Sequence, residues 1–202
     1  MTEEPTVFIV DDDPAITDSL SELALSVDLK SRSFGSAGEF LNSYDDDPPG
    51  CLILDVRMAE MSGLELQRAL TDKDSDLPII IVTGHGDVQV AVHAMKAGAF
   101  DFIEKPFSNQ MLLERVQDAL KTNRVRRTKR HARKEAELKL DKLTPRERDI
   151  FDRLVLGKTN KAIANELELS EKTIEGYRAN VTEKLGIGSL ENLISLSTAI
   201  EA

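Results

Sequence analysis

The chain has 202 residues, a length that suits one large domain or two modest ones, each with its own core. Apolar residues make up 41% of the sequence and charged residues 31%, which is typical of a globular chain and excludes a largely disordered one. No stretch approaches the ~18 uncharged apolar residues of a membrane helix, so no membrane partner is expected.

The formal net charge of −10 is unevenly distributed. Residues 1–120 hold 8 Lys/Arg and 23 Asp/Glu, residues 121–142 hold 10 and 3, and residues 143–202 hold 8 and 10. An acidic block, a basic segment and a near-neutral tail are expected to have separate roles. The sequence divides accordingly into an N-terminal domain over residues 1–122, a helical basic linker over 123–140 and a C-terminal domain over 141–202.

The N-terminal residues show neither a basic region nor an apolar region of a secretory signal, and a cytoplasmic location is expected. Cys51 has no second cysteine to pair with and lies in an apolar run. It is expected to be an inert strand residue in a reducing compartment.

Residues 5–122 alternate short apolar runs with helix-length periodic segments. The runs are Val7–Val10, Cys51–Leu54, Ile79–Val82 and Phe100–Ile103, and Leu29–Phe34 can supply one more strand. The helical segments are marked by Ile16/Leu20/Leu23, Leu64/Leu66/Leu70, Val88/Val92/Met95 and Leu112/Val116/Leu120. Apolar strands separated by helices predict parallel β-α-β units, and therefore an α/β, doubly wound, five-stranded parallel sheet. Ligands bind such sheets beyond the carboxyl ends of the strands.

Acidic, hydroxyl and amine side chains follow the predicted strands. Asp11 and Asp12 come after the first strand, and Asp13 before Pro14 fits a helix N-cap. Asp55, Thr83 and Lys105 end or follow the third, fourth and fifth strands, so these groups should converge at one edge of the sheet. Clustered carboxylates raise one another's pKa unless a cation neutralises them, and this oxygen set favours Mg²⁺. An aspartate beside Mg²⁺ can act as a nucleophile toward a phosphoryl group, whose oxygens Thr83 and Lys105 can bind.

The amino-acid sequence of these segments resembles that of the receiver domain of two-component response regulators, in the FixJ-like subgroup. The likeness rests on Ile9–Asp13, Leu54–Met58, Thr83–Val88, Ala94–Ala99, Asp101–Glu104 and Lys105–Phe107. It implies a flavodoxin-like fold in which a sensor histidine kinase phosphorylates Asp55. The resemblance further implies that Asp12, Asp55 and the carbonyl of Arg57 ligate Mg²⁺ with help from Asp11. Thr83 is then the switch hydroxyl, Phe102 the rotating aromatic, and the Lys105–Pro106 peptide cis.

The tail shows helical signals and no strand signal. Thr144 and Glu147 have capping-box spacing with Pro145 at the first helical position, and Gly157 fits a helix stop. A second helix at 161–167, a tight turn at 168–170, a third helix from Glu171 to Gly186 and a fourth at 190–200 should follow. Two helices joined by a tight turn meet the requirement for reading the major groove, although a generic helical bundle shows the same periodicity.

Several stretches of the tail resemble the LuxR/FixJ-type helix-turn-helix. They are Leu143–Arg148, Gly157–Ala164, Ser170–Glu175, Arg178–Val181 and Lys184–Gly186. On the third helix, Ile174, Tyr177, Val181 and Leu185 share a face and should pack inward. The residues expected to face DNA are Lys172, Thr173, Glu175, Gly176, Arg178, Ala179, Asn180 and Lys184. Gly176 and Tyr177 depart from the Val and His usual in that family, and the domain's charge of −2 predicts weak electrostatic affinity for DNA in a monomer.

Together these features predict a response regulator in which phosphorylation of Asp55 controls homodimerisation and binding to promoter DNA, with RNA polymerase as a further candidate partner and no turnover of external substrates. A phosphatase with an aspartate nucleophile is a second class, but it needs an acid/base aspartate two residues later, where this chain has Arg57. A receiver that acts only by protein contact, with the tail as a docking bundle, is a third. His85 and His93 are interpreted as ordinary loop and surface residues.

Overall fold

The structure is a computed structural model that describes residues 4–44, 48–84, 88–187 and 189–201. It divides into two compact units, Met1–Arg127 and Thr128–Ala202. The division falls within the predicted linker; the domain boundaries taken from the sequence stay predictions. Within the described ranges, no helix combines the length and the apolar character needed to cross a membrane.

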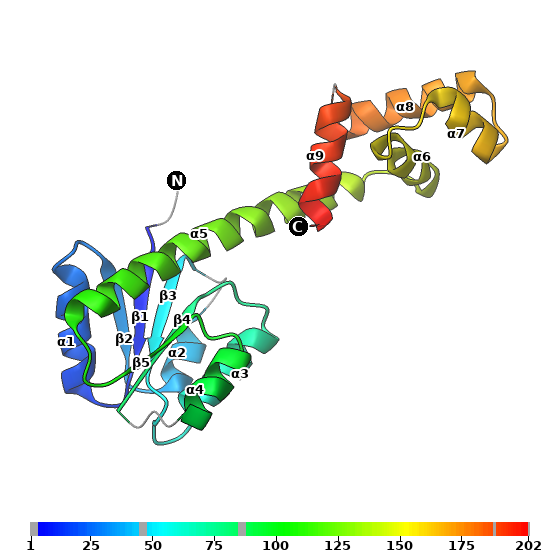
Figure 1. The fold of residues 1–202 in the computed structure, drawn as a ribbon. Helices are drawn as coiled ribbons and strands as arrows, with labels where there is room; N and C mark the ends of the chain where they lie inside the picture. Colours follow the sequence, from blue (N-terminus) through cyan, green and yellow to red (C-terminus); the bar gives the residue numbers. More distant parts are fainter. Residues whose placement is uncertain (1–3, 45–47, 85–87, 188, 202) are drawn as a thin grey trace. The chain divides into compact units, whose positions relative to one another are not determined.

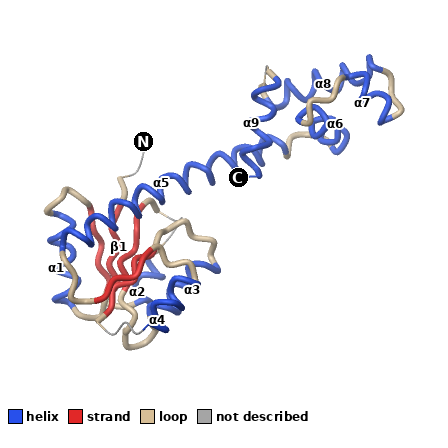
Figure 2. Tube along the Cα trace, in the orientation of Figure 1, coloured by secondary structure: helices blue, strands red, loops and turns tan. Residues whose placement is uncertain are grey.

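The first unit is built on a five-stranded parallel sheet (Figure 2). Its strands are β1 (Thr6–Val10), β2 (Lys30–Phe34), β3 (Gly50–Leu54), β4 (Ile79–Thr83) and β5 (Asp101–Glu104), in the order β2-β1-β3-β4-β5. The three central strands are buried almost throughout because they are apolar on both faces, whereas the edge strand β2 exposes much of its polar sequence. The doubly wound fold predicted from the sequence is confirmed.

Helices cover both faces of this sheet (Figure 1). On one face, α1 (Pro14–Leu25) and α5 (Asn109–Leu140) contribute Leu20, Leu112 and Val116 to a buried cluster. On the other face lie α2 (Ala37–Ser43), α3 (Gly63–Asp72) and α4 (Val88–Lys96). Asp13 caps α1 as predicted, accepting a hydrogen bond from the Ala15 N–H at 2.9 Å. The sequence did not predict α2, which has only seven residues and therefore no full apolar repeat.

The periodic residues of α4 face solvent. Val88, Val92 and Met95 are 79%, 45% and 46% exposed, while the only fully buried residue described in this helix is Ala94. The apolar repeat thus predicted the helix correctly, but the residues of the repeat lie on the solvent-facing side of α4. This leaves an apolar strip on the surface of the first unit.

Helix α5 runs without a break from Asn109 to Leu140, through a stretch that lacks both Gly and Pro. Asn123, which is 2% exposed, anchors it to the first unit. Its side-chain oxygen accepts a hydrogen bond from the Gly50 N–H at 3.0 Å, and its amide nitrogen donates to the Asp76 carbonyl at 3.0 Å.

The second unit is helical and has its own core. Its helices α6 (Pro145–Val155), α7 (Asn160–Leu167), α8 (Glu171–Leu185) and α9 (Leu190–Glu201) pack, together with Leu140, around Ile150, Phe151 and Leu154. Thr144 and Glu147 form the predicted capping box with Pro145 at the first helical position. Gly157 and Gly186 adopt φ of +73° and +66° at the ends of α6 and α8, where glycine avoids the strain of a side chain. The predicted turn at 168–170 is confirmed, with Glu168 at φ +53°.

Candidate functional site

The carboxyl ends of the strands bring two acids and a lysine into contact. Lys105 Nζ donates to Asp11 Oδ2 at 2.7 Å and to Asp55 Oδ1 at 3.1 Å, which links the residues that follow β1, β3 and β5. Asp11 and Asp55 are 6% and 8% exposed. The convergence expected from the strand order is therefore realised for these three side chains.

Backbone contacts hold the Asp55 carboxylate in a fixed orientation. The Arg57 N–H donates to Asp55 Oδ2 at 2.6 Å, while the Asp55 N–H extends the β1–β3 ladder to the Val10 carbonyl at 2.9 Å. Asp11 is fixed similarly, because its Oδ1 accepts from the Asp13 N–H at 2.9 Å. Each of these carboxylates is thus held from two sides.

Burial and charge act in opposite directions on these groups. Burial raises the pKa of Asp55, and the nearby Asp11 charge adds to this, while the Lys105 ammonium and the Arg57 N–H partly offset the rise. Burial by itself would lower the pKa of Lys105, but its hydrogen bonds to Asp11 and Asp55 outweigh that effect and raise it. At neutral pH the lysine is therefore a fixed positive charge beside the Asp55 carboxylate.

The other residues predicted for the pocket belong to the same strand ends or to the residues next to them. Thr83 is 1% exposed at the end of β4, and the Lys105 N–H donates to its carbonyl at 2.9 Å. Phe102 on β5 is half-buried and packs against the core on the face of α2–α4. Asp12 and Arg57 are exposed, and the Lys105–Pro106 peptide is cis as expected. His85 lies outside the described residues, and His93 contacts Arg68 on the surface, with 2.6 Å between their nitrogens.

The donor chemistry fits a magnesium ion. Asp11 and Asp55 present oxygens within 3.1 Å of a common nitrogen, and Asp12 and the Arg57 backbone follow the same two strand ends. Among the described residues, no three His, Cys, Asp or Glu side chains gather into a ready-made metal site. Mg²⁺ does not need one, because it is usually bound through one or two carboxylates together with waters and substrate phosphate oxygens.

Gly63 is a part of this site that sequence reasoning missed. A Cβ at Gly63 would lie 2.1 Å from the Asp55 carbonyl oxygen, and its N–H donates to the Val56 carbonyl at 3.0 Å. The start of α3 can therefore approach the Asp55 backbone only with glycine at this position. Its spacing from Asp55 carries no signal in a single sequence.

Cys51 takes no part in this chemistry. Its side chain is fully buried in β3, and burial raises the pKa of its thiol to about 12. A thiol in this state is not a nucleophile at neutral pH, as the sequence predicted.

In the second unit, α8 presents the expected polar face. Ile174, Val181 and Leu185 are buried and Tyr177 is half-buried against them, whereas Thr173, Glu175, Gly176, Ala179 and Asn180 are exposed together with Lys172 and Arg178. Arg178 Nη1 donates to Asn160 Oδ1 of α7 at 3.2 Å. Lys184 differs from the other cations because its Nζ lies 2.6 Å from Glu147 Oε2, in an ion pair with the capping residue of α6. Hydrogen bonds from Lys184 and from the Thr144 N–H lower the pKa of Glu147.

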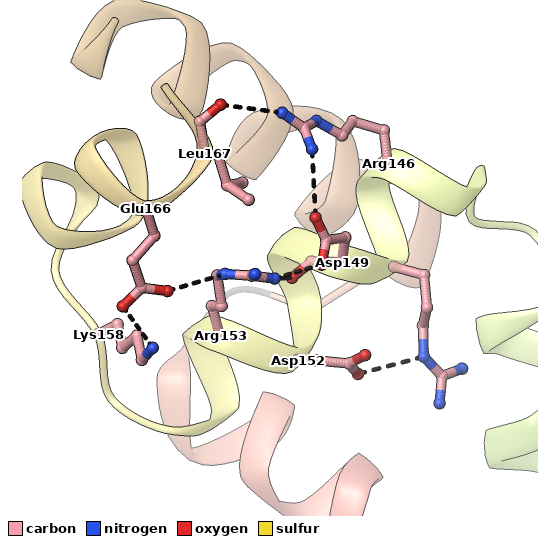
Figure 3. Close-up of polar contacts among 8 residues, drawn as sticks. Arg146, Asp149, Asp152, Arg153, Lys158, Glu166 and Leu167 are labelled. Carbon is pink, nitrogen blue, oxygen red and sulfur yellow. Dashed lines mark hydrogen bonds and ion pairs between the residues drawn. The ribbon is translucent and has the colours of Figure 1, made fainter. Parts of the chain in front are cut away.

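A network of ion pairs joins Glu166, near the end of α7, to α6 and to the loop between the two helices (Figure 3). Arg153 contacts both Asp149 and Glu166, and Lys158 lies 2.5 Å from the other oxygen of Glu166. Arg146 pairs with Asp149 at 3.3 Å and also donates to the Leu167 carbonyl at 3.4 Å. These contacts connect α6 and α7 through charged side chains as well as through the core.

Comparison with known proteins gives both units clear relatives. Residues 7–117 match the response regulator receiver domain, and residues 141–197 match the bacterial regulatory proteins of the luxR family. The chain is 42% identical over 189 residues to the transcriptional regulatory protein TdiR of Thauera aromatica, covering 94% of this chain and 83% of TdiR. It is 38% identical over 197 residues to the transcriptional regulatory protein FixJ of Bradyrhizobium diazoefficiens, covering 98% and 96% of the two chains. A solved structure of the response regulator StyR matches with a TM-score of 0.84 and 40% identity, over 97% of this chain and 99% of that one.

Proposed function

The chain belongs to the two-component response regulators that join a receiver domain to a LuxR-family DNA-binding domain, and on that premise we propose that Asp55 is its phosphoacceptor. The observation that carries the proposal is the buried Asp55 carboxylate, held by the Arg57 N–H and paired with Lys105 beside Asp11. A carboxylate fixed in this way has one oxygen oriented by the backbone and the other directed toward a cation.

In the proposed reaction, an Asp55 oxygen attacks the phosphorus of a phosphohistidine on the partner kinase. A P–O bond forms as the P–N bond breaks, and the histidine nitrogen leaves with the electron pair. Lys105 then turns from the Asp55 carboxylate to a phosphoryl oxygen, which it binds as a point charge. Its raised pKa supports this role, because the ammonium stays protonated throughout the neutral range.

Magnesium would be held by Asp12, Asp55 and the Arg57 carbonyl, with Asp11 close by. When bound, Mg²⁺ neutralises negative charge on the phosphoryl oxygens and on the crowded carboxylates. Asp12 follows Asp11 in the chain and is exposed, so it is accessible to an ion that arrives with its waters. We assign the chain no turnover of external substrates, because position 57 carries an arginine where an aspartate phosphatase needs its second acid.

We assign the switch to Thr83 and Phe102, which connect the pocket to the surface formed by α4 and β5. Thr83 would bond the phosphoryl group, and the half-buried Phe102 would turn inward as the hydroxyl moves. The exposed apolar strip of Val88, Val92 and Met95 on α4 supports homodimerisation on this surface after phosphorylation. A typical coupling free energy of about 1–3 kcal/mol is enough to shift such an equilibrium.

The DNA-reading surface we propose is the exposed face of α8. Glu175, Gly176 and Ala179 would lie toward base edges, while Lys172 and Arg178 bind phosphates, with Thr173 and Asn180 beside them. Lys184 is held by Glu147 and contributes less than its sequence position suggests. RNA polymerase is proposed as a partner at the promoter, and the cytoplasm as the place of action.

The phosphoacceptor is tested by treating the full-length protein with acetyl phosphate and Mg²⁺ and measuring its intact mass. The wild type and the matched surface variant Asp18→Asn should each gain ~80 Da, the mass of one phosphoryl group, and Asp55→Asn should gain nothing. An adduct on Asp55→Asn, or none on the wild type, refutes the assignment.

A further inference from the structure

Residues 143–202, the part of the second unit that follows α5 and that we call the DNA-binding unit, have few cations available for DNA. Residues 143–202 contain 8 Lys/Arg and 10 Asp/Glu. Five of the eight cations are in ion pairs within the unit, namely Arg146, Arg148, Arg153, Lys158 and Lys184. Figure 3 shows the pairs of Arg146, Arg153 and Lys158. That leaves Lys161, Lys172 and Arg178, which form no ion pair within the described part of the chain. Three phosphate contacts correspond to a salt slope of only about −3, whereas useful binders commonly make more.

The strongest positive charge in the chain lies just before this unit, on α5. Residues 124–134, which we call the basic segment, contain seven Lys/Arg and no Asp or Glu. Arg126, Lys129 and Lys134 are exposed, and none of these three forms an ion pair within the described residues. Arg126 and Lys129 are one helical turn apart and therefore lie on the same side of the helix.

This arrangement is unfavourable for a helix by itself. Like charges three or four residues apart on a helix repel each other and destabilise it. Arg126 and Lys129 are such a pair, whereas Arg133 at the end of the segment has a compensating acid, since it pairs with Glu137 at 2.9 Å. A polyanion bound along the segment would relieve this repulsion.

We infer that the basic segment of α5 is a second DNA-contacting surface, which binds phosphates of duplex DNA. The inference rests on the proposed function and extends it, because it assigns DNA contact outside the helix-turn-helix. Duplex DNA is the occupant because its phosphates carry the dense charge that the DNA-binding unit itself is poorly equipped to attract. An acidic protein surface fits less well. Specific protein interfaces depend on buried apolar or aromatic anchors, and the only large apolar residue of the segment is Val125.

The test measures the affinity of the phosphorylated full-length protein for a mixed-sequence duplex over a range of salt concentrations. Arg126→Gln/Lys129→Gln is compared with Lys30→Gln/Lys73→Gln, which removes the same charge from exposed positions of the receiver. Glutamine is a good helix former, and circular dichroism confirms that helix content is kept. The segment variant should bind more weakly, with the salt slope reduced in magnitude by about two per protomer, and the control should match the wild type.

The possible results separate this inference from the proposed function. Wild-type DNA binding that Arg178→Ala weakens, together with an unchanged slope in Arg126→Gln/Lys129→Gln, refutes the basic segment and leaves the DNA-binding function standing. An equal fall of the slope in the receiver control also refutes the segment, because overall charge would then explain the effect. If the phosphorylated wild type binds neither this duplex nor promoter DNA, the proposed function fails, and the inference fails with it.

Discussion

Two glycines of the DNA-binding unit allow a stability prediction in which the same added methyl group has opposite effects. Gly176 lies inside α8, and Gly186 ends it at φ +66°. A Cβ built at either position meets no atom within 4 Å, so packing contributes nothing to the difference. Gly176→Ala should stabilise α8 by about 0.5–1 kcal/mol, since a mid-helix glycine loses more backbone entropy on folding than alanine does. Gly186→Ala should destabilise it by about 1–2 kcal/mol, because a left-handed φ strains any residue with a Cβ.

Hydrogen exchange of the α8 amides, followed by mass spectrometry on the full-length protein, measures this difference in the element concerned. Given about 1.4 kcal/mol per tenfold change, α8 should exchange roughly two- to fivefold more slowly in Gly176→Ala. In Gly186→Ala it should exchange at least about fivefold faster. Peptides from β3 in the receiver serve as the internal control and should not change. Faster exchange of α8 in Gly176→Ala would refute the reasoning, since it would mean that the helix requires glycine there for a contact absent from this structure.

Two further predictions concern the receiver. Asn123→Ala should lower the free energy of unfolding of the receiver by about 2–4 kcal/mol, because the Gly50 N–H and the Asp76 carbonyl lose their partner. Urea denaturation measures this loss. The control Val125→Ala, at a 58% exposed position, should change stability by less than about 0.5 kcal/mol. Asp55→Asn should raise the melting temperature at pH 7. Burial raises the pKa of Asp55, so the ionised carboxylate lowers the stability of the folded wild type at pH values above that raised pKa. Calorimetry at several pH values should therefore show that the difference in melting temperature between variant and wild type becomes smaller as the pH falls from the raised pKa toward the ordinary pKa of about 4.

The receiver fold could be predicted from the sequence because its signals are local and repeated. β1, β3 and β4 are apolar runs that remain buried on both faces, and parallel strands place their carboxyl ends at one edge. This is why Asp11, Asp55 and Lys105 could be grouped although they lie far apart in the chain. Two helices were harder to predict. Nothing in the sequence indicated α2, which has too few residues for an apolar repeat. The apolar repeat of α4 indicated a helix but not that these residues face solvent rather than the core.

Contacts that depend on partners distant in sequence could not be predicted. Asn123 reads as one polar residue in a basic helix, yet it bonds to backbone groups 73 and 47 residues away. Glu147 fits a capping box, and nothing local indicates that it also holds Lys184, 37 residues later. In both cases the residue type indicated a polar role, but the choice of partner depends on how helices and strands pack in three dimensions.

The pairing of charges in the DNA-binding unit constrains how it can bind DNA. Arg153, Lys158 and Lys184 lie close to the acids that hold α6, α7 and α8 together, so their charge is largely cancelled before DNA arrives. Releasing one of them to a phosphate would leave its carboxylate without a partner, and that loss offsets the new contact. Affinity must therefore come from cations outside these pairs or from a second copy of the unit. The basic segment would supply the first under the inference above, and the proposed dimerisation after phosphorylation would supply the second. On this argument an unphosphorylated monomer binds DNA weakly even though its recognition helix is fully formed.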